Sequence, residues 1–126
     1  MINNEIHIIT NNPLVFESYC TKVRAVFVQG GYLEVLKQVR NRVHEGYKLI
    51  THPLMGSIKP NETPYRSLII EGGDSLDLHS LEIIESSIYT CEKFLKDNNT
   101  PEWLAKVLED FQYIDEKLLE SAFLSL

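Results

Sequence analysis

The sequence lacks the features that mark secreted, membrane-spanning and redox-active proteins. It has two cysteines in 126 residues, Cys20 and Cys91, and no CxxC pair that would bind a metal or exchange disulfides. No apolar run approaches the ~20 residues that span a bilayer, and no basic stretch followed by an apolar one marks a signal peptide. We therefore expect a cytoplasmic protein with two free thiols and no membrane partner.

Basic side chains are also scarce. The chain has 12 Lys and Arg against 18 Asp and Glu, a net charge of −6, which argues against a nucleic-acid partner. The excess of acid lies in the second half of the chain. We interpret these carboxylates as solvated helix faces, with a partner of basic surface as the alternative. The set comprises Glu82, Glu85, Glu92, Glu109, Asp110, Asp115 and Glu116.

Motifs for cofactors are missing as well. The four histidines show no HxH or HxxxH spacing, so we expect no bound metal. Gly30 and Gly31 precede a helical segment, but neither GxGxxG nor GxxxxGK[ST] is present. We interpret the glycine pair as a tight turn between a strand and a helix, and we expect no cofactor.

Short β-branched runs alternate with helical periodicity, an order typical of α/β proteins. The patterns predict strands at 5–10, 22–28, 47–51 and 67–71, and helices at 14–19, 32–45, 78–96 and from 100 onward. We expect a single α/β domain over residues 1–126. Its small three- to four-stranded, mostly parallel sheet is flanked by helices, two of them C-terminal. The first three strands should be parallel and adjacent, with helix 32–45 crossing between the second and third. The orientation of strand 67–71 stays open.

The two C-terminal helices carry apolar residues at helical spacing. In the first, we expect one buried stripe, made of Leu81, Ile84, Ile88, Cys91 and Leu95. The second should begin with Thr100 as N-cap and Pro101 at its first position. Its expected inner face consists of Leu104, Val107, Leu108, Phe111, Ile114, Leu118 and Ala122.

The longest irregular segment, residues 51–66, contains three prolines and no period. Ligands of open α/β sheets bind beyond the carboxyl ends of parallel strands, where this loop and the end of the first strand should meet. We expect a small polar or anionic ligand there, and the alternative is a rigid loop whose side chains satisfy its own backbone. The candidate ligand contacts are Asn11, Asn12, Thr51, His52, Ser57, Lys59, Asn61, Thr63, Tyr65 and Arg66.

Two other functions stay open. His52 is the best single candidate for a general base, because Pro53 holds its backbone extended and imidazole titrates near neutral pH. No acid partner follows from the spacing, so whether the protein is an enzyme, with Lys59 or Arg66 clamping an anion, is not decided. The third hypothesis is an interaction module that docks through the acidic C-terminal helices. Leu124 and Leu126 would fit a second subunit, and hence a homodimer.

Three runs resemble the GrdX family: ITNNPLV at 9–15, LITHPLMGSIKPNETPY at 49–65 and DFQYID at 110–115. The long middle run is the specific part. The resemblance implies a small protein that accompanies the glycine, sarcosine and betaine reductase systems of amino-acid-fermenting anaerobes. A component of the reductase complex is then an implied partner. Because the family has no assigned activity, the resemblance implies no catalytic residues. The two cysteines fit no redox motif, so we expect an accessory protein and not a catalytic subunit.

Overall fold

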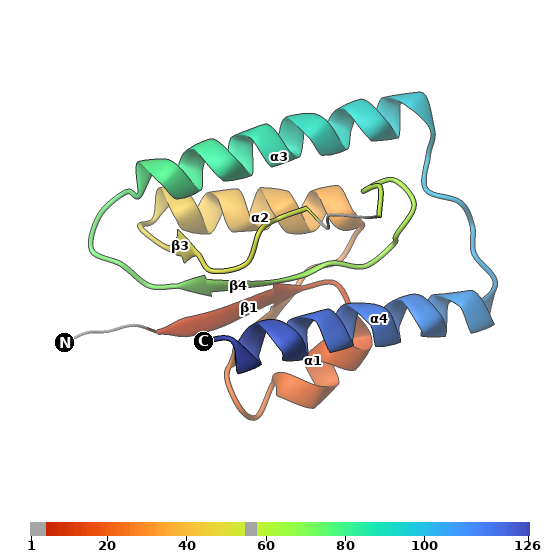
Figure 1. Ribbon diagram of the computed structural model, residues 1–126, viewed down its shortest axis with the longest axis horizontal. Coiled ribbons are helices and arrows are strands. Elements are labelled where there is room, and N and C mark those ends of the chain that lie inside the picture. Colours follow the sequence, from red (N-terminus) through yellow and green to blue (C-terminus); the bar gives the residue numbers. More distant parts are fainter. Residues whose placement is uncertain (1–4, 55–57) are drawn as a thin grey trace.

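The computed structural model describes residues 5–54 and 58–126, and over these ranges it is a three-layer α/β structure. The sheet lies between helices α2 and α3 on one face and α1 and α4 on the other (Figure 1). This confirms the predicted fold class and the pair of C-terminal helices. In chain order the elements are β1 (Ile6–Thr10), α1 (Pro13–Tyr19), β2 (Arg24–Phe27), α2 (Tyr32–His44), β3 (Lys48–Leu49), β4 (Ser67–Glu71), α3 (Leu78–Asp97) and α4 (Ala105–Leu124). None of these helices is long and apolar enough to cross a membrane.

The sheet is mixed, in the order β2-β1-β4-β3. β1 and β2 are parallel, whereas β4 is antiparallel to both of its neighbours, β1 and β3. The sheet is therefore not mostly parallel, and the third strand is not next to the second, which corrects those two expectations. The expected common direction of the first three strands is confirmed, since β1 and β3 are both antiparallel to β4. The mixed sheet arises because the described residues of the long segment between β3 and β4 contain no crossover helix. A strand that returns without a crossover pairs antiparallel, and β4 does so between β1 and β3.

Four chain segments lie together at one edge of the sheet. β1, β2 and β3 all run in one direction, so their carboxyl ends lie on the same side as the start of β4. The pairing of Thr10 with Ser67 marks this edge. The residues after Thr10, the Gly30–Gly31 turn and the loop after β3 all leave from it. The expected meeting of the irregular loop with the end of the first strand is therefore present.

The core between the sheet and α2/α3 contains the predicted stripe of α3. Ile84, Ile88 and Cys91 are buried, and Leu81 and Leu95 pack against the same cluster. Asp77 caps this helix, since its Oδ2 accepts a hydrogen bond from Ser80 N at 3.0 Å. The stripe is thus confirmed.

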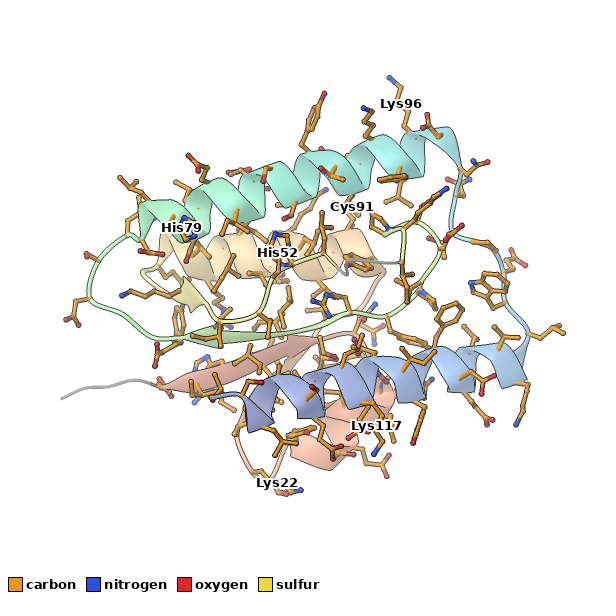
Figure 2. All side chains as sticks on the ribbon, viewed as in Figure 1. Lys22, His52, His79, Cys91, Lys96 and Lys117 are labelled. Atoms are coloured by element: carbon orange, nitrogen blue, oxygen red, sulfur yellow. The ribbon has the colours of Figure 1, made fainter. Side chains whose placement is uncertain are left out.

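The two cysteines differ in burial, and this predicts a difference in reactivity. Both are free thiols, as expected; Cys20 is exposed, whereas Cys91 lies on α3 in the core (Figure 2). Burial raises the pKa of the Cys91 thiol to about 11, so it is protonated at neutral pH. We expect a thiol reagent at neutral pH to modify only Cys20 in the native protein, and Cys91 after unfolding in urea. Rapid modification of both thiols in the native state would contradict this core.

The start and the rotation of α4 differ from the sequence prediction. The helix begins at Ala105, and Leu104 occupies the N-cap without a side-chain hydrogen bond, so Thr100 is not the cap. Trp103 Nε1 donates to Glu62 O at 3.0 Å in this connecting segment. Only Asp115 and Leu119 of α4 are buried. The residues predicted as its inner face are half-buried or exposed, which corrects that expectation: Leu104, Val107, Leu108, Phe111, Ile114, Leu118 and Ala122.

Candidate functional site

A buried polar cluster lies at the sheet edge where β1 ends and β4 begins. Thr10 Oγ1 and Ser67 Oγ share a hydrogen bond of 2.7 Å. Asp115 reaches the same point from α4 and accepts from Ser67 N at 3.1 Å, Ser67 Oγ at 2.6 Å and Asn12 Nδ2 at 3.0 Å. Asn12 Nδ2 also donates to Gln112 O at 3.0 Å. We name Thr10, Asn12, Ser67 and Asp115 the strand-edge cluster; it ties α4 to the sheet.

Asp115 is the residue of this cluster that the sequence analysis misplaced. Its side chain is fully buried, not part of a solvated helix face. A buried carboxylate is stable only when its oxygens accept hydrogen bonds, and here three donors satisfy them. The run 110–115, which carried part of the family resemblance, contains both Asp115 and Gln112. That run is the feature of the sequence that could have indicated the cluster.

Asn11 and Arg66 hold the long loop against the same edge. Asn11 Nδ2 donates to Gly30 O at 2.9 Å and to Pro64 O at 2.8 Å, while its Oδ1 accepts from Arg66 N at 2.9 Å. The Arg66 guanidinium donates to Pro53 O at 3.0 Å and to His52 O. Both side chains are buried. Asn11, Asn12 and Arg66 were expected to contact a ligand. Their side-chain N–H groups described above instead donate to groups of the protein itself.

Other candidate residues also make local contacts. Thr51 Oγ1 accepts from Ile69 N at 3.0 Å, and Thr63 Oγ1 lies within hydrogen-bond distance of Tyr65 N and O. The Tyr65 hydroxyl accepts from Gln112 Nε2 at 3.0 Å. The Thr63 contacts fit the alternative of a loop that satisfies its own backbone, whereas Thr51 and Tyr65 bond to β4 and α4. Ser57 lies outside the described residues.

His52 has the geometry of a turn residue. Its Nδ1 accepts from Leu54 N at 3.0 Å, and its side chain is exposed. Within residues 5–54 and 58–126, no carboxylate forms an ion pair with it. The backbone N–H of Leu54 occupies one ring nitrogen, and no carboxylate that would support a general base is found in these ranges. Across the same ranges, no three His, Cys, Asp or Glu side chains gather at a potential metal site.

The remaining two candidates, Lys59 and Asn61, border a cavity of about 350 Å³ between the loop and the C-terminal end of α3. This volume is in the range of small-molecule sites. We name it the loop–helix pocket. Its lining residues are Lys59, Asn61, Glu62, Phe94, Asp97, Asn98, Asn99 and Pro101.

The loop–helix pocket combines an unsatisfied acceptor with charges of both signs. Asn61 is 6% exposed; its Nδ2 donates to Asn98 O at 3.1 Å, whereas its buried Oδ1 has no hydrogen-bond partner among the described atoms. Lys59 supplies a cation, and Glu62 and Asp97 supply two carboxylates. The C-terminal end of α3 adds partial negative charge. The wall is therefore suited to an N–H donor more than to a simple anion.

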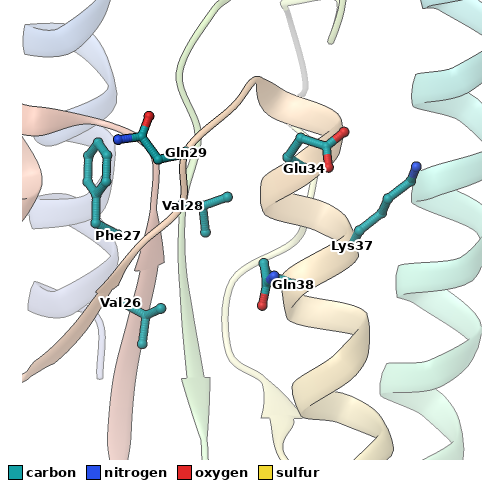
Figure 3. Close-up of a pocket in the computed structure, with 7 residues that line it drawn as sticks. All are labelled: Val26, Phe27, Val28, Gln29, Glu34, Lys37 and Gln38. Carbon is teal, nitrogen blue, oxygen red and sulfur yellow. The ribbon is translucent and has the colours of Figure 1, made fainter.

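A second cavity of about 360 Å³ lies between the edge strand β2 and α2 (Figure 3). Val26 and Val28 form its apolar wall, and Glu34 and Lys37 lie at its rim on the helix. No buried polar atom without a partner is found among its described side chains. Because no buried polar atom of this second cavity lacks a partner among the described residues, the loop–helix pocket is the better candidate site.

Sequence reasoning found the loop side of this pocket but not its helix side. Phe94, Asp97 and Asn99 lie far along the chain from Lys59, at the C-terminal end of α3. The signal was the cluster Asp97–Asn99, since polar residues after a helix expose acceptors. Nothing local in the sequence places this helix end beside the loop.

Comparison with known proteins gives one finding. A protein-family model, GrdX-like protein, matches residues 7–124, nearly the whole chain. No curated protein and no solved structure matches the chain. The matched range includes both the strand-edge cluster and the loop–helix pocket. The chain therefore belongs to the GrdX-like protein family.

Proposed function

We propose that this chain is a cytoplasmic accessory protein that binds a small zwitterion in the loop–helix pocket. Family membership supports an accessory protein associated with glycine reductase systems. The single observation that carries the ligand proposal is Asn61, a residue lining the pocket whose buried Oδ1 has no hydrogen-bond partner among the described residues. An unpaired buried acceptor is unfavourable, and a ligand N–H would satisfy it.

The charges of the pocket narrow the ligand class. A carboxylate on the ligand would bind Lys59, and an ammonium group would lie toward Asp97 and Asn61. A purely anionic ligand such as phosphate would meet the two carboxylates and the negative end of α3. We therefore narrow the expected ligand class from polar or anionic molecules to molecules that carry both a positive and a negative charge.

The number of N–H groups on the ligand should set the affinity. Glycine has an ammonium group with three N–H donors, sarcosine has two, and betaine has none. If Asn61 Oδ1 accepts from the ligand, titration calorimetry should rank glycine above sarcosine and sarcosine above betaine. Phosphate and acetyl phosphate should bind more weakly than glycine. Equal affinity for glycine and betaine would contradict the role of Asn61.

Lys59→Ala should weaken glycine binding about tenfold. This loss is near the low end of the range for a charged hydrogen bond, because Lys59 is exposed to solvent. Lys106→Ala removes an equally exposed lysine from α4, outside the pocket, and is the matched control. Both variants should keep the melting temperature of the wild type. A Lys59→Ala variant that binds like the control would exclude this pocket as the carboxylate site.

The other functions have weaker support. For catalysis by His52, the exposed side chain and its turn hydrogen bond offer no observation in favour. Association with a reductase component follows from the family alone and stays a proposal. Association with a second copy of the chain involves a different surface, on α4.

A further inference from the structure

Helix α4 carries an apolar stripe that the described residues cover only in part, with Trp103 packing on Phe111 at 5.5 Å between ring centroids. Ile114 and Leu118 are 42% and 44% exposed, and Val107 and Phe111 are half-buried. These four residues follow one another at intervals of four, three and four positions, the spacing of a coiled-coil seam. An exposed stripe of this length is typical of an interaction surface.

The stripe lies on the side of α4 that faces away from α1. α1 packs on the opposite side, where Tyr19 stacks on Phe123 at 5.4 Å between ring centroids. Asp115 and Leu119 point to the sheet, about 60° and 100° around the helix from Leu118. A second helix could therefore lie along the stripe without displacing α1.

The charges beside the stripe are self-complementary. Asp110 and Lys117 flank it on the solvent side, and both are exposed. If a second α4 packs antiparallel, with Phe111 opposite Ile114 and Val107 opposite Leu118, Asp110 of each copy lies beside Lys117 of the other. A two-fold axis brings the same patch of both subunits together in this way.

We propose that the α4 stripe is the interface of an antiparallel homodimer. A second copy satisfies both the apolar seam and the two flanking charges, which a partner with a uniformly basic surface would not do. The contacts of Lys117 with Glu116 at 3.8 Å and Glu120 at 3.5 Å are surface pairs, and such pairs rearrange at small cost.

Sedimentation velocity on the full chain tests this proposal. The mass should rise from 14.5 kDa toward a dimer of twice that value between about 1 and 200 µM, since one helix pair makes a small interface. Leu118→Asp should abolish the rise. Tyr89→Asp, an exposed aromatic on α3, is the matched control and should dimerise like the wild type.

Charge exchange gives a test that leaves the apolar stripe intact. Lys117→Glu alone and Asp110→Lys alone each place like charges together and should weaken the dimer several-fold, whereas the double variant should restore it. All substituted side chains are exposed, and circular dichroism checks that each variant folds. A wild type that stays monomeric throughout, a dimer that survives Leu118→Asp, or a double variant no better than the singles would overturn the proposal. If the protein stays monomeric, the stripe would instead be a binding surface for a different protein.

Discussion

Replacing Asp115 by alanine should lower the free energy of unfolding by about 3–5 kcal/mol. The substitution removes the acceptor of Ser67 N, Ser67 Oγ and Asn12 Nδ2 in a fully buried place. It also leaves the Arg66 guanidinium, 4.0 Å from Asp115 Oδ1, without a neighbouring carboxylate. Urea unfolding followed by circular dichroism measures the loss.

Two further variants make this result specific to the strand-edge cluster. Asp115→Asn keeps one acceptor oxygen for Ser67 N and should cost less than alanine. Glu109→Ala removes an exposed carboxylate six positions earlier on α4 and should change stability by less than ~0.5 kcal/mol. If Asp115→Ala cost no more than Glu109→Ala, Asp115 would not join α4 to the sheet.

Truncating the buried stripe of α3 should have an effect of similar size. Ile84 is 0% and Ile88 is 4% exposed, and both pack in the core between the sheet and α2. Ile84→Ala or Ile88→Ala should each cost about 2–4 kcal/mol, because transfer energy is lost and a cavity remains. Urea titration of each variant measures the cost.

The matched control for α3 lies on its solvent face. Glu85→Ala breaks the surface pair with Arg40, 3.4 Å long, and should change stability by less than ~0.5 kcal/mol. A cost below ~1 kcal/mol for both isoleucine variants would mean that this face of α3 is not in the core.

Local patterns were enough to predict several elements of this fold. The α3 stripe followed from three- and four-residue spacing, and the bounds of β4 followed from a β-branched run closed by glycines. Asn12 and Asp77 cap α1 and α3, because short polar side chains before a helix accept its first N–H groups. Strand order was not predictable in the same way. Pairing β4 between β1 and β3 depends on contacts between residues far apart in the chain.

The rotation of α4 shows why the candidate site was only partly predictable. The helix carries two overlapping apolar sides, one through Phe111 and Leu118 and one through Asp115 and Leu119. Apolar spacing alone favours the first, since the second contains a carboxylate. The second turns inward because Asp115 meets Asn12 and Ser67, which lie 103 and 48 positions away in the chain.

The loop–helix pocket was only partly predictable from the sequence for the same reason. The loop residues Lys59 and Asn61 were identifiable as polar candidates, but so were Asn11 and Arg66, which bind backbone groups of the protein itself. Only the position of the loop relative to the end of α3 separates the two groups. That position is fixed by contacts such as Asn61 Nδ2 to Asn98 O, across 37 positions of the chain.

The most direct test of the proposed function is an amide proton–nitrogen correlation spectrum of the labelled full chain, titrated with glycine. The proposal predicts saturable shifts confined to residues 59–62 and 94–101, and smaller ones with betaine at equal concentration. The same titration of Lys59→Ala should need about tenfold more glycine to reach the same shifts. No shift with glycine, or shifts that cluster along β2 and α2 instead, would contradict the assignment of the ligand site to the loop–helix pocket.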